Sequence, residues 1–174
     1  MHKGIILIVK ASDRDEAQSE AEDFLIPYED QVLDWWQIGG RWTGILDGYD
    51  PEKDPINIET CPQCNGTGKR DDLIGRRMKE DNPDFTCNSC KGEGKRVKWP
   101  TQWEEHKGDI LPLDKVKKNV LEEWKQNPKT AGDKLRQDFN SNCNIFNVET
   151  DDYNLPDEKD WKDNWWAIII DIHH

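Results

Sequence analysis

The chain has 174 residues, which suits one domain or a domain that carries a small insertion. Hydrophobic residues make up only 34% of it, against roughly 45–50% apolar residues in an ordinary soluble domain. The formal net charge of −12 excludes a general binder of nucleic acid or of anionic membranes, because phosphate groups repel such a surface. It favours a partner with a basic surface, or a role in solubility.

Two apolar runs are the candidates for a membrane segment, GIILIV near the N-terminus and WWAIII near the C-terminus. Both are far shorter than the roughly 20 residues that a membrane-spanning helix needs. We therefore expect no membrane segment and a cytoplasmic location. Four of the five cysteines fall in CxxC pairs, a spacing that in the cytosol indicates metal ligation rather than disulfides.

The N-terminal elements are predicted from short apolar runs. GIILIVKA (4–11) is rich in β-branched residues and predicts a buried strand. A helix is expected directly after it, with Ser12 as the N-cap and acidic residues in the first turn. QVLDWWQIGGRWTGIL (31–46) has the composition of a strand, and Gly39 with Gly40 predicts a turn or bulge within it.

The C-terminal part predicts a further helix and two strands. The helix is expected over about 114–126, where apolar residues form one stripe, with one or two helical turns at 132–139. NIFNVE (144–149) and WWAIIIDI (165–172) predict strands. This order of elements predicts an α+β fold, a small and mainly antiparallel sheet with helices on one face. Our first interpretation is a ferredoxin-like arrangement, with the first and last strands side by side and antiparallel.

A doubled cysteine motif lies between these elements. CPQCNGTG (61–68) and CNSCKGEG (87–94) share the frame CxxCxGxG, although most of their other letters differ. Each CxxC turn offers two thiolates, and two turns supply the four soft ligands of a tetrahedral zinc ion. A redox-active dithiol and a pair of disulfides are the alternatives. We predict one structural Zn²⁺ at a closed site formed by four residues, Cys61, Cys64, Cys87 and Cys90.

Both segments resemble the CxxCxGxG repeats in the cysteine-rich region of DnaJ-type chaperones, where paired repeats build a zinc site. The resemblance implies zinc at these four cysteines and covers 16 of the 174 residues. The chain has two repeats where those chaperones carry four, and no HPD signature of a J-domain. The resemblance therefore implies a metal site and a local fold, but no co-chaperone activity. We expect residues 61–98 to be an inserted zinc module, and 1–60 with 99–174 to form the α+β body.

The expected zinc module differs in charge from the rest of the chain. Residues 61–98 hold nine Lys or Arg and six Asp or Glu, so the remainder carries −15. Nucleic-acid contact through this module is one hypothesis, and Lys69, Arg70, Lys95 and Arg96 are its candidate residues. A solvated surface is the alternative, because acidic residues interrupt the basic clusters.

The GGRW segment is a candidate binding loop. The glycines let a ligand approach the backbone, Arg41 offers a pairing group for a carboxylate or phosphate, and Trp36 and Trp42 offer aromatic rings for stacking. The alternative is a strand bulge in which Arg41 packs on tryptophan. The stretch WWQIGGRWTG also resembles segments of uncharacterised phage and bacterial proteins, a resemblance that implies no activity.

The ends of the chain supply a second candidate site. If the first and last strands pair antiparallel, His2 and His173 lie close together, with Asp171 on the same sheet face. Such a group suits a second metal ion and hydrolytic chemistry. The alternative is a pair of frayed termini.

No nucleotide-binding, hydrolase or metalloprotease signature occurs in the sequence, so no catalytic residue is assigned. The sequence favours a zinc-stabilised acidic protein that binds a macromolecular partner as an adaptor or inhibitor. An enzyme or binder of a nucleotide-like, phosphorylated ligand at the GGRW loop is the first alternative. Nucleic-acid binding through 61–98 is the second.

Overall fold

The computed structural model of the chain describes residues 2–29, 31–124 and 145–173. Within these ranges, no helix has both the length and the apolar character that crossing a membrane requires. The helical turns expected at 132–139, and the fifth cysteine, Cys143, lie outside the described residues.

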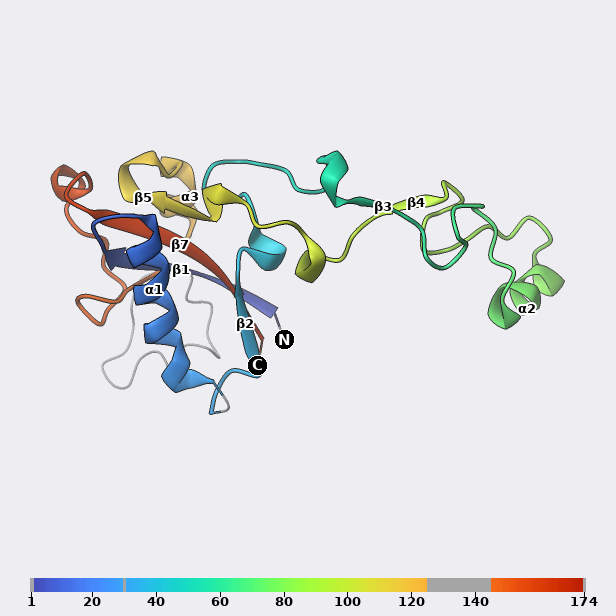
Figure 1. Cartoon of the computed structure of the whole chain (residues 1–174), viewed down its shortest axis with the longest axis horizontal. Helices are drawn as coiled ribbons and strands as arrows, with labels where there is room; N and C mark the ends of the chain where they lie inside the picture. Colours follow the sequence, from blue (N-terminus) through green and yellow to red (C-terminus); the bar gives the residue numbers. More distant parts are fainter. Residues whose placement is uncertain (1, 30, 125–144, 174) are drawn as a thin grey trace. The chain divides into compact units, whose positions relative to one another are not determined.

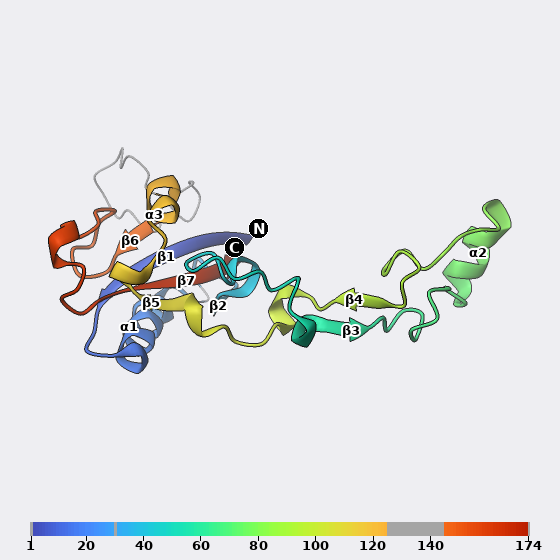
Figure 2. The same ribbon diagram turned by 90° about the horizontal axis from the view of Figure 1, so that it is seen from above.

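The chain forms two compact units (Figures 1 and 2). Residues 1–50 and 105–174 make up what we call the α+β unit, and residues 51–104 the cysteine unit. The cysteine unit interrupts the α+β unit as an insertion. It is wider than the expected 61–98, because the segments on both sides of the cysteine motifs fold together with them.

The described part of the α+β unit is built on a five-stranded sheet, mixed but mostly antiparallel. The strands are β1 (His2–Lys10), β2 (Trp35–Ile38), β5 (Ile110–Pro112), β6 (Ile145–Asn147) and β7 (Trp165–His173). The path through the sheet is β2-β7-β1-β6, with β5 also paired to β7. β1 and β7 are antiparallel neighbours along their whole lengths, so the expected pairing of first and last strands is confirmed. β6 is parallel to β1, and the arrangement is compatible with a ferredoxin-like fold.

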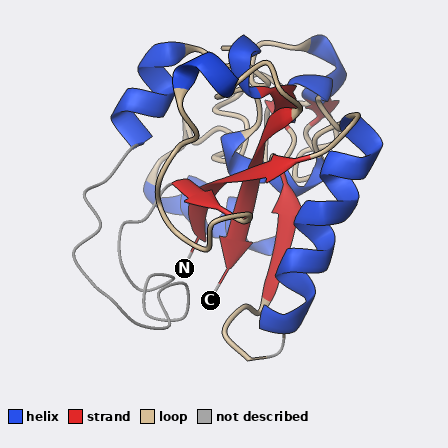
Figure 3. Cartoon of the chain, turned by 90° about the vertical axis from the view of Figure 1, so that its left-hand side faces the viewer, coloured by secondary structure: helices blue, strands red, loops and turns tan. Residues whose placement is uncertain are grey.

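Helix α1 (Arg14–Leu25) covers one face of this sheet (Figures 1 and 3). Ala17, Ala21 and Leu25 follow each other at intervals of four, so they lie on one side of the helix and are fully buried. The N-cap is Asp13 rather than the expected Ser12, because the Asp13 carboxylate accepts the Glu16 backbone N–H at 2.9 Å.

The second face of the sheet is also covered. Ile6 and Ile8 of β1 and Ile169 of β7 pack there against apolar residues that come after β2 and around helix α3 (Lys118–Trp124). Helices therefore lie on both faces, whereas the sequence favoured one. The helix expected over 114–126 is shorter in its described part, because a separate 3₁₀ turn over Leu113–Lys115 precedes α3.

The strand expected over 31–46 is confirmed only at its centre. β2 ends at Ile38, and Gly39 and Gly40 have φ angles of 74° and 55°, which turn the chain out of the sheet. A 3₁₀ turn over Gly40–Trp42 follows. The chain then continues as turns rather than as a second strand segment.

The cysteine unit holds a small sheet and one helix. β3 (Ile58–Thr60) and β4 (Lys95–Val97) pair antiparallel, and α2 (Leu73–Asp81) lies between the two cysteine motifs in the sequence. Buried Asn57 joins the two ends of the unit. Its side chain donates to the Pro51 carbonyl at 3.1 Å and accepts the Glu104 backbone N–H at 3.3 Å.

Candidate metal centre

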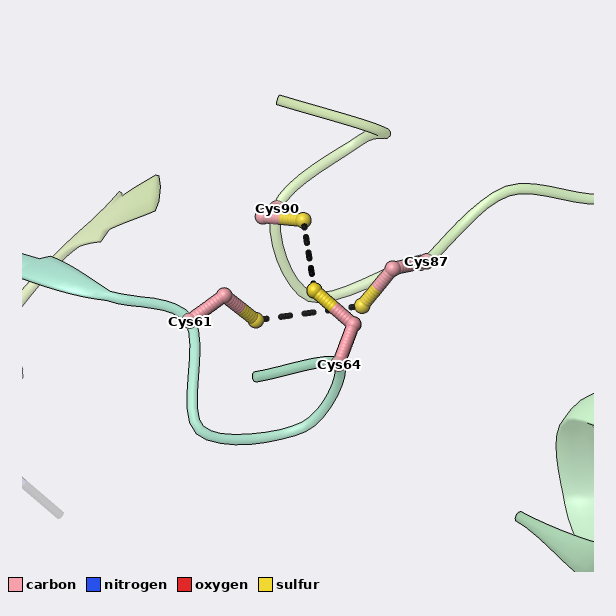
Figure 4. Close-up of side chains that lie close together, drawn as sticks. All are labelled: Cys61, Cys64, Cys87 and Cys90. Carbon is pink, nitrogen blue, oxygen red and sulfur yellow. Dashed lines mark hydrogen bonds between the residues drawn. The ribbon is translucent and has the colours of Figure 1, made fainter. Parts of the chain in front are cut away.

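Four cysteines of the cysteine unit converge on one point (Figure 4). Their sulfur atoms all lie within 4.8 Å of one another, and each residue is buried. Within the described ranges, this is the only group of histidine, cysteine or carboxylate side chains with that geometry. The predicted site residues Cys61, Cys64, Cys87 and Cys90 are therefore brought together.

The sulfur spacing fits a tetrahedral metal ion. The Cys61 and Cys87 sulfurs lie 3.8 Å apart and those of Cys64 and Cys90 3.7 Å apart. A tetrahedral ion with metal–sulfur bonds of about 2.3 Å requires edges of about 3.8 Å. All four thiols are free, and these two sulfur–sulfur contacts each link one CxxC turn to the other. The cluster therefore has the form of a metal site and not of two disulfides.

The backbone supports the sulfurs in the same way in both repeats. The Gly68 N–H donates to the Cys64 sulfur, and the Gly94 N–H to the Cys90 sulfur, each at 3.3 Å. Such N–H groups stabilise a thiolate and orient it toward a metal. Both glycines have positive φ angles, 71° and 76°, so the CxxCxGxG frame is used for backbone geometry as well as for ligands.

The two repeats also hold each other. The Cys61 N–H donates to the Gly94 carbonyl, and the Cys87 N–H to the Gly68 carbonyl, both at 2.9 Å. The first of these bonds continues the β3–β4 pairing, whose last pair is Thr60 with Lys95. Each repeat therefore relies on the other for the backbone hydrogen bond at its first cysteine.

The thiols of one repeat differ in acidity. At Cys61 burial raises the pKa, but hydrogen bonds from the backbone of Gln63 and Cys64 and from the Ser89 side chain outweigh it and lower the pKa to about 6. At Cys64 burial is the largest cause and raises the pKa to about 11, despite a hydrogen bond from the backbone of Gly68. Several thiolates at this spacing repel one another, and a divalent cation is what holds them ionised together.

Two of the four basic residues proposed for nucleic-acid contact bond to other side chains of the cysteine unit. Arg70 is buried and bonds the Asp72 carboxylate at 2.8 Å and the Asn88 side chain at 3.0 Å. Arg96 bonds Glu59 at 2.8 Å and the Ser89 hydroxyl at 3.2 Å. Lys69 and Lys95 are exposed.

Comparison with known proteins returns no match: no protein family, no curated protein and no solved structure. The fold and the cysteine cluster define the class, an α+β protein with an inserted unit that can hold a metal ion at four cysteines.

The structure separates the residues proposed for the GGRW loop. Trp36 packs with the core on the α1 face of the sheet, and its indole N–H donates to Glu29 at 2.6 Å. Trp42 packs with the core on the opposite face, edge-on to Trp124 with ring centroids 5.5 Å apart. Arg41 and Trp42 line one pocket, of which Trp36 is not a part.

Two buried carboxylates hold the GGRW turn, a role that sequence reasoning gave to neither, although it named Asp171 as part of the group at the chain ends. Asp171 accepts the Arg41 backbone N–H at 3.0 Å, and Asp109 accepts the Gly44 N–H at 2.8 Å. Both are at most 2% exposed. The available signal was an acidic residue inside the apolar run WWAIIIDI, because a buried carboxylate requires hydrogen-bond donors nearby.

The buried carboxyl group of Asp109 is expected to make the stability of the fold depend on pH. Burial raises its pKa to about 6, against the lowering effect of the Gly44 N–H bond. The folded state thus holds its proton more tightly than the unfolded state, so the carboxylate destabilises the fold above about pH 6, and that cost disappears as the pH falls toward 4. We expect Asp109→Asn to raise the free energy of unfolding at pH 8 by about 2–3 kcal/mol and to change it little at pH 4.

Urea unfolding at both pH values measures this difference, with exposed Asp163→Asn as the control. An equal effect of Asp109→Asn at pH 8 and pH 4 would show that folding does not raise the pKa of this carboxyl group.

The third predicted group lies together at the chain ends, but without the tight spacing of the cysteine cluster. His2 pairs with His173 across β1 and β7, with ring centroids 5.1 Å apart, and the His2 Nδ1 lies 3.1 Å from Asp171. The His173 Nδ1 instead bonds Asp34 at 2.9 Å, and its ring stacks on Trp35. Because these nitrogens contact different carboxylates, the three residues do not converge as the cysteines do. A second metal here stays a prediction.

Proposed function

We propose that the metal is one Zn²⁺ per chain and that its role is structural. Four cysteine ligands at tetrahedral spacing leave no open coordination position, which is typical of structural rather than catalytic zinc. The DnaJ-type CxxCxGxG frame supports the same assignment. The unit also needs such support, because its buried hydrophobic side chains are the four cysteines themselves.

We further propose that the chain is a non-catalytic, intracellular binding protein whose zinc-stabilised unit presents helix α2 to a protein partner. One observation carries this proposal. Three large apolar side chains of α2, Leu73, Ile74 and Met78, are 82%, 56% and 43% exposed. Exposed apolar residues gathered on one element are typical of interaction sites.

The orientation of α2 follows from its contacts. Asp72 caps the helix by accepting the Gly75 N–H at 2.8 Å, and Gly75 is buried against the Arg70 carbonyl, where any side chain would overlap it. Leu73, Ile74 and Met78 lie on the remaining surface of the helix. A short helix held at one side and apolar at the other suits the helix-in-groove mode of recognition.

The chemistry of the partner follows from the residues around this apolar face. Arg77 lies on the same side of α2 and is exposed, and it forms no ion pair with any described residue. We infer an apolar groove with acidic groups at its rim. Nucleic acid is disfavoured, because Arg70 and Arg96 are occupied within the unit and its residues 51–104 hold as many acidic as basic side chains.

The acidic surface offers a competing explanation. The cysteine unit has ten Lys or Arg and ten Asp or Glu, so the net charge of −12 belongs to the α+β unit. A partner with a basic surface would bind there instead, and that association would weaken strongly with salt. Apolar docking at α2 would depend little on salt.

A variant pair and a salt series separate these hypotheses. We expect Leu73→Ser with Met78→Ser to weaken capture of the partner from host lysate at least tenfold, because each truncated anchor costs about 1–2 kcal/mol. Ile26→Ser, which removes a side chain 55% exposed in the α+β unit, is the matched control and should leave capture unchanged. Zinc content of one per chain in every variant shows that the cysteine unit is folded.

The results of these experiments show which surface of the chain binds the partner. Three results together support the proposal. The α2 variant loses capture of the partner, the unchanged chain retains capture at 0.5 M NaCl, and a benzophenone side chain at position 77 crosslinks to the captured protein. Capture that survives the α2 changes but disappears in high salt assigns binding to the acidic unit and contradicts the proposal. Capture abolished by nuclease favours nucleic acid.

A further inference from the structure

A pocket of about 380 Å³ opens in the α+β unit between the turns that follow β2 and helix α3. Its volume falls within the range of small-molecule sites, about 300–1,000 Å³. The side chains that matter for its chemistry are Arg41, Trp42, Tyr49, Lys117, Asn119 and Glu123. It is independent of the cysteine unit and of helix α2.

The pocket gathers positive charge in an acidic unit. Arg41 and Lys117 both line it, both are exposed, and neither forms an ion pair with a described residue. Arg14 of the same unit, by contrast, is paired with Glu105 at 2.7 Å. One carboxylate, Glu123, also lines the pocket, so its net charge is positive. Two cations held near each other and left without counter-charges favour an anionic ligand.

A fixed aromatic ring forms another part of the lining. Tyr49 stacks on His106 with ring centroids 4.0 Å apart and planes inclined by 13°. The His106 Nε2 lies 2.7 Å from the Asp47 carboxylate, and the Asp47 carboxylate also accepts the Tyr49 backbone N–H at 2.9 Å. These three residues fix one another, so the ring offers a planar surface at little cost in conformational entropy.

Trp42 contributes an unused donor. Its indole nitrogen is buried and has no hydrogen-bond partner among the described residues. Buried N–H groups are nearly always paired, because leaving one unpaired costs about 1–3 kcal/mol. Because the nitrogen is shielded from solvent, a ligand can pair with it only if the Trp42 side chain turns toward the pocket on binding.

The pocket is preformed. Buried Asp171 and Asp109 hold the backbone of Arg41 and Gly44, as described above, and the Lys117 N–H donates to the Leu46 carbonyl at 3.0 Å. The Lys117 ammonium lies against Gly48, where any side chain would overlap it. The backbone segments that carry Arg41 and Lys117 are therefore fixed by contacts with the core, which lowers the entropic cost of binding a ligand.

We propose that this pocket binds a nucleoside monophosphate or a chemically equivalent phosphorylated aromatic ligand. The phosphate lies between Arg41 and Lys117, and the planar base packs on the aromatic lining formed by Tyr49 and Trp42. This assignment does not depend on the partner proposed for α2.

Calorimetric titration of the full zinc-loaded chain with AMP, GMP, UMP, adenosine and inorganic phosphate tests the proposal. We expect saturable binding of at least one nucleotide, with affinity reduced about tenfold or more in Arg41→Ala and in Lys117→Ala, since each loses a charge-assisted contact. Lys162→Ala, which removes an exposed cation outside this pocket, should bind as the unchanged chain does.

A spectroscopic readout keeps the result separate from folding. The Trp42 indole signal in a ¹H–¹⁵N spectrum, assigned with Trp42→Phe, should shift on nucleotide addition. Failure of all three nucleotides to bind at millimolar concentration overturns the proposal. So does equal affinity in Arg41→Ala and Lys117→Ala, or adenosine binding as tightly as AMP. Inorganic phosphate binding as tightly as AMP contradicts the aromatic part of the assignment.

Discussion

Replacing Cys87 with serine is expected to abolish metal binding and to unfold the cysteine unit, while the α+β unit keeps its structure. The buried hydrophobic side chains of the cysteine unit are the four metal-ligating cysteines, so no apolar core remains when the ion is lost. A structural zinc ion contributes about 10–16 kcal/mol of binding free energy, far more than the other contacts of a unit this small. The α+β unit has its own two apolar clusters and does not depend on the metal.

Elemental analysis and ¹H–¹⁵N spectra measure these two effects. The Cys87→Ser spectrum should lose dispersion for residues 51–104 only, and the zinc content should fall from one per chain to near zero. Cys143→Ser removes the one cysteine outside the two CxxC motifs and is the matched control, expected to retain one zinc. Dispersed signals from 51–104 in zinc-free Cys87→Ser would refute the structural role of the metal.

Replacing Gly68 with alanine is expected to weaken metal binding about a hundredfold. A Cβ at Gly68 would overlap the Gly92 carbonyl, which belongs to the opposite repeat and cannot rotate away. Because that repeat carries two of the ligands, the overlap pushes the two pairs of sulfurs apart. A hundredfold change corresponds to about 3 kcal/mol, larger than the about 1–2 kcal/mol that alanine costs in a left-handed conformation alone.

Gly66→Ala isolates the backbone cost. Gly66 has a φ of 81°, close to the 71° of Gly68, but a Cβ there would lie 3.1 Å from a Thr60 methyl group, which has room to adjust. We expect Gly66→Ala to weaken zinc binding about tenfold in competition with a chromophoric chelator. Equal losses in the two variants would mean that the contact between repeats does not limit the site.

The cysteine cluster was within reach of sequence reasoning because its signal is local. Cys61 and Cys64 are brought together by one turn, and the spacing alone places both thiols on the same side of it. The second pair repeats the pattern, so only one long-range contact had to be assumed. The glycines in the same frame are also determined locally, because their φ angles depend on the turn and not on the rest of the fold.

The central strands were also predictable, for a different reason. β1 and β7 are almost continuously apolar, which is the pattern of strands buried on both faces. Their mutual pairing was a topological guess that the structure bears out. The extent of the 31–46 strand and the N-cap of α1 were not predicted correctly, because hydrogen bonds to Ile169 and Glu16 decide where those elements end and begin.

The residues that share a binding surface could be identified only from the three-dimensional structure. Nothing near Trp36 or Trp42 in the sequence indicates that they lie on opposite faces of the sheet, and only the alternation along β2 and the turn after it separates them. Asp109 accepts a hydrogen bond from the GGRW turn, and Lys117 lines a pocket together with Arg41 of that turn. Both residues are more than sixty positions away from the turn in the sequence.

Sequence alone was enough to bring the four cysteines together, to assign the α+β class and to find the two central strands, because each depends on spacing or periodicity within a few residues. The tertiary structure decided which arginines remain available, which face of α2 is exposed, and which cations share a pocket. Those properties depend on contacts between segments far apart in the chain, and such contacts leave no periodic pattern in the sequence.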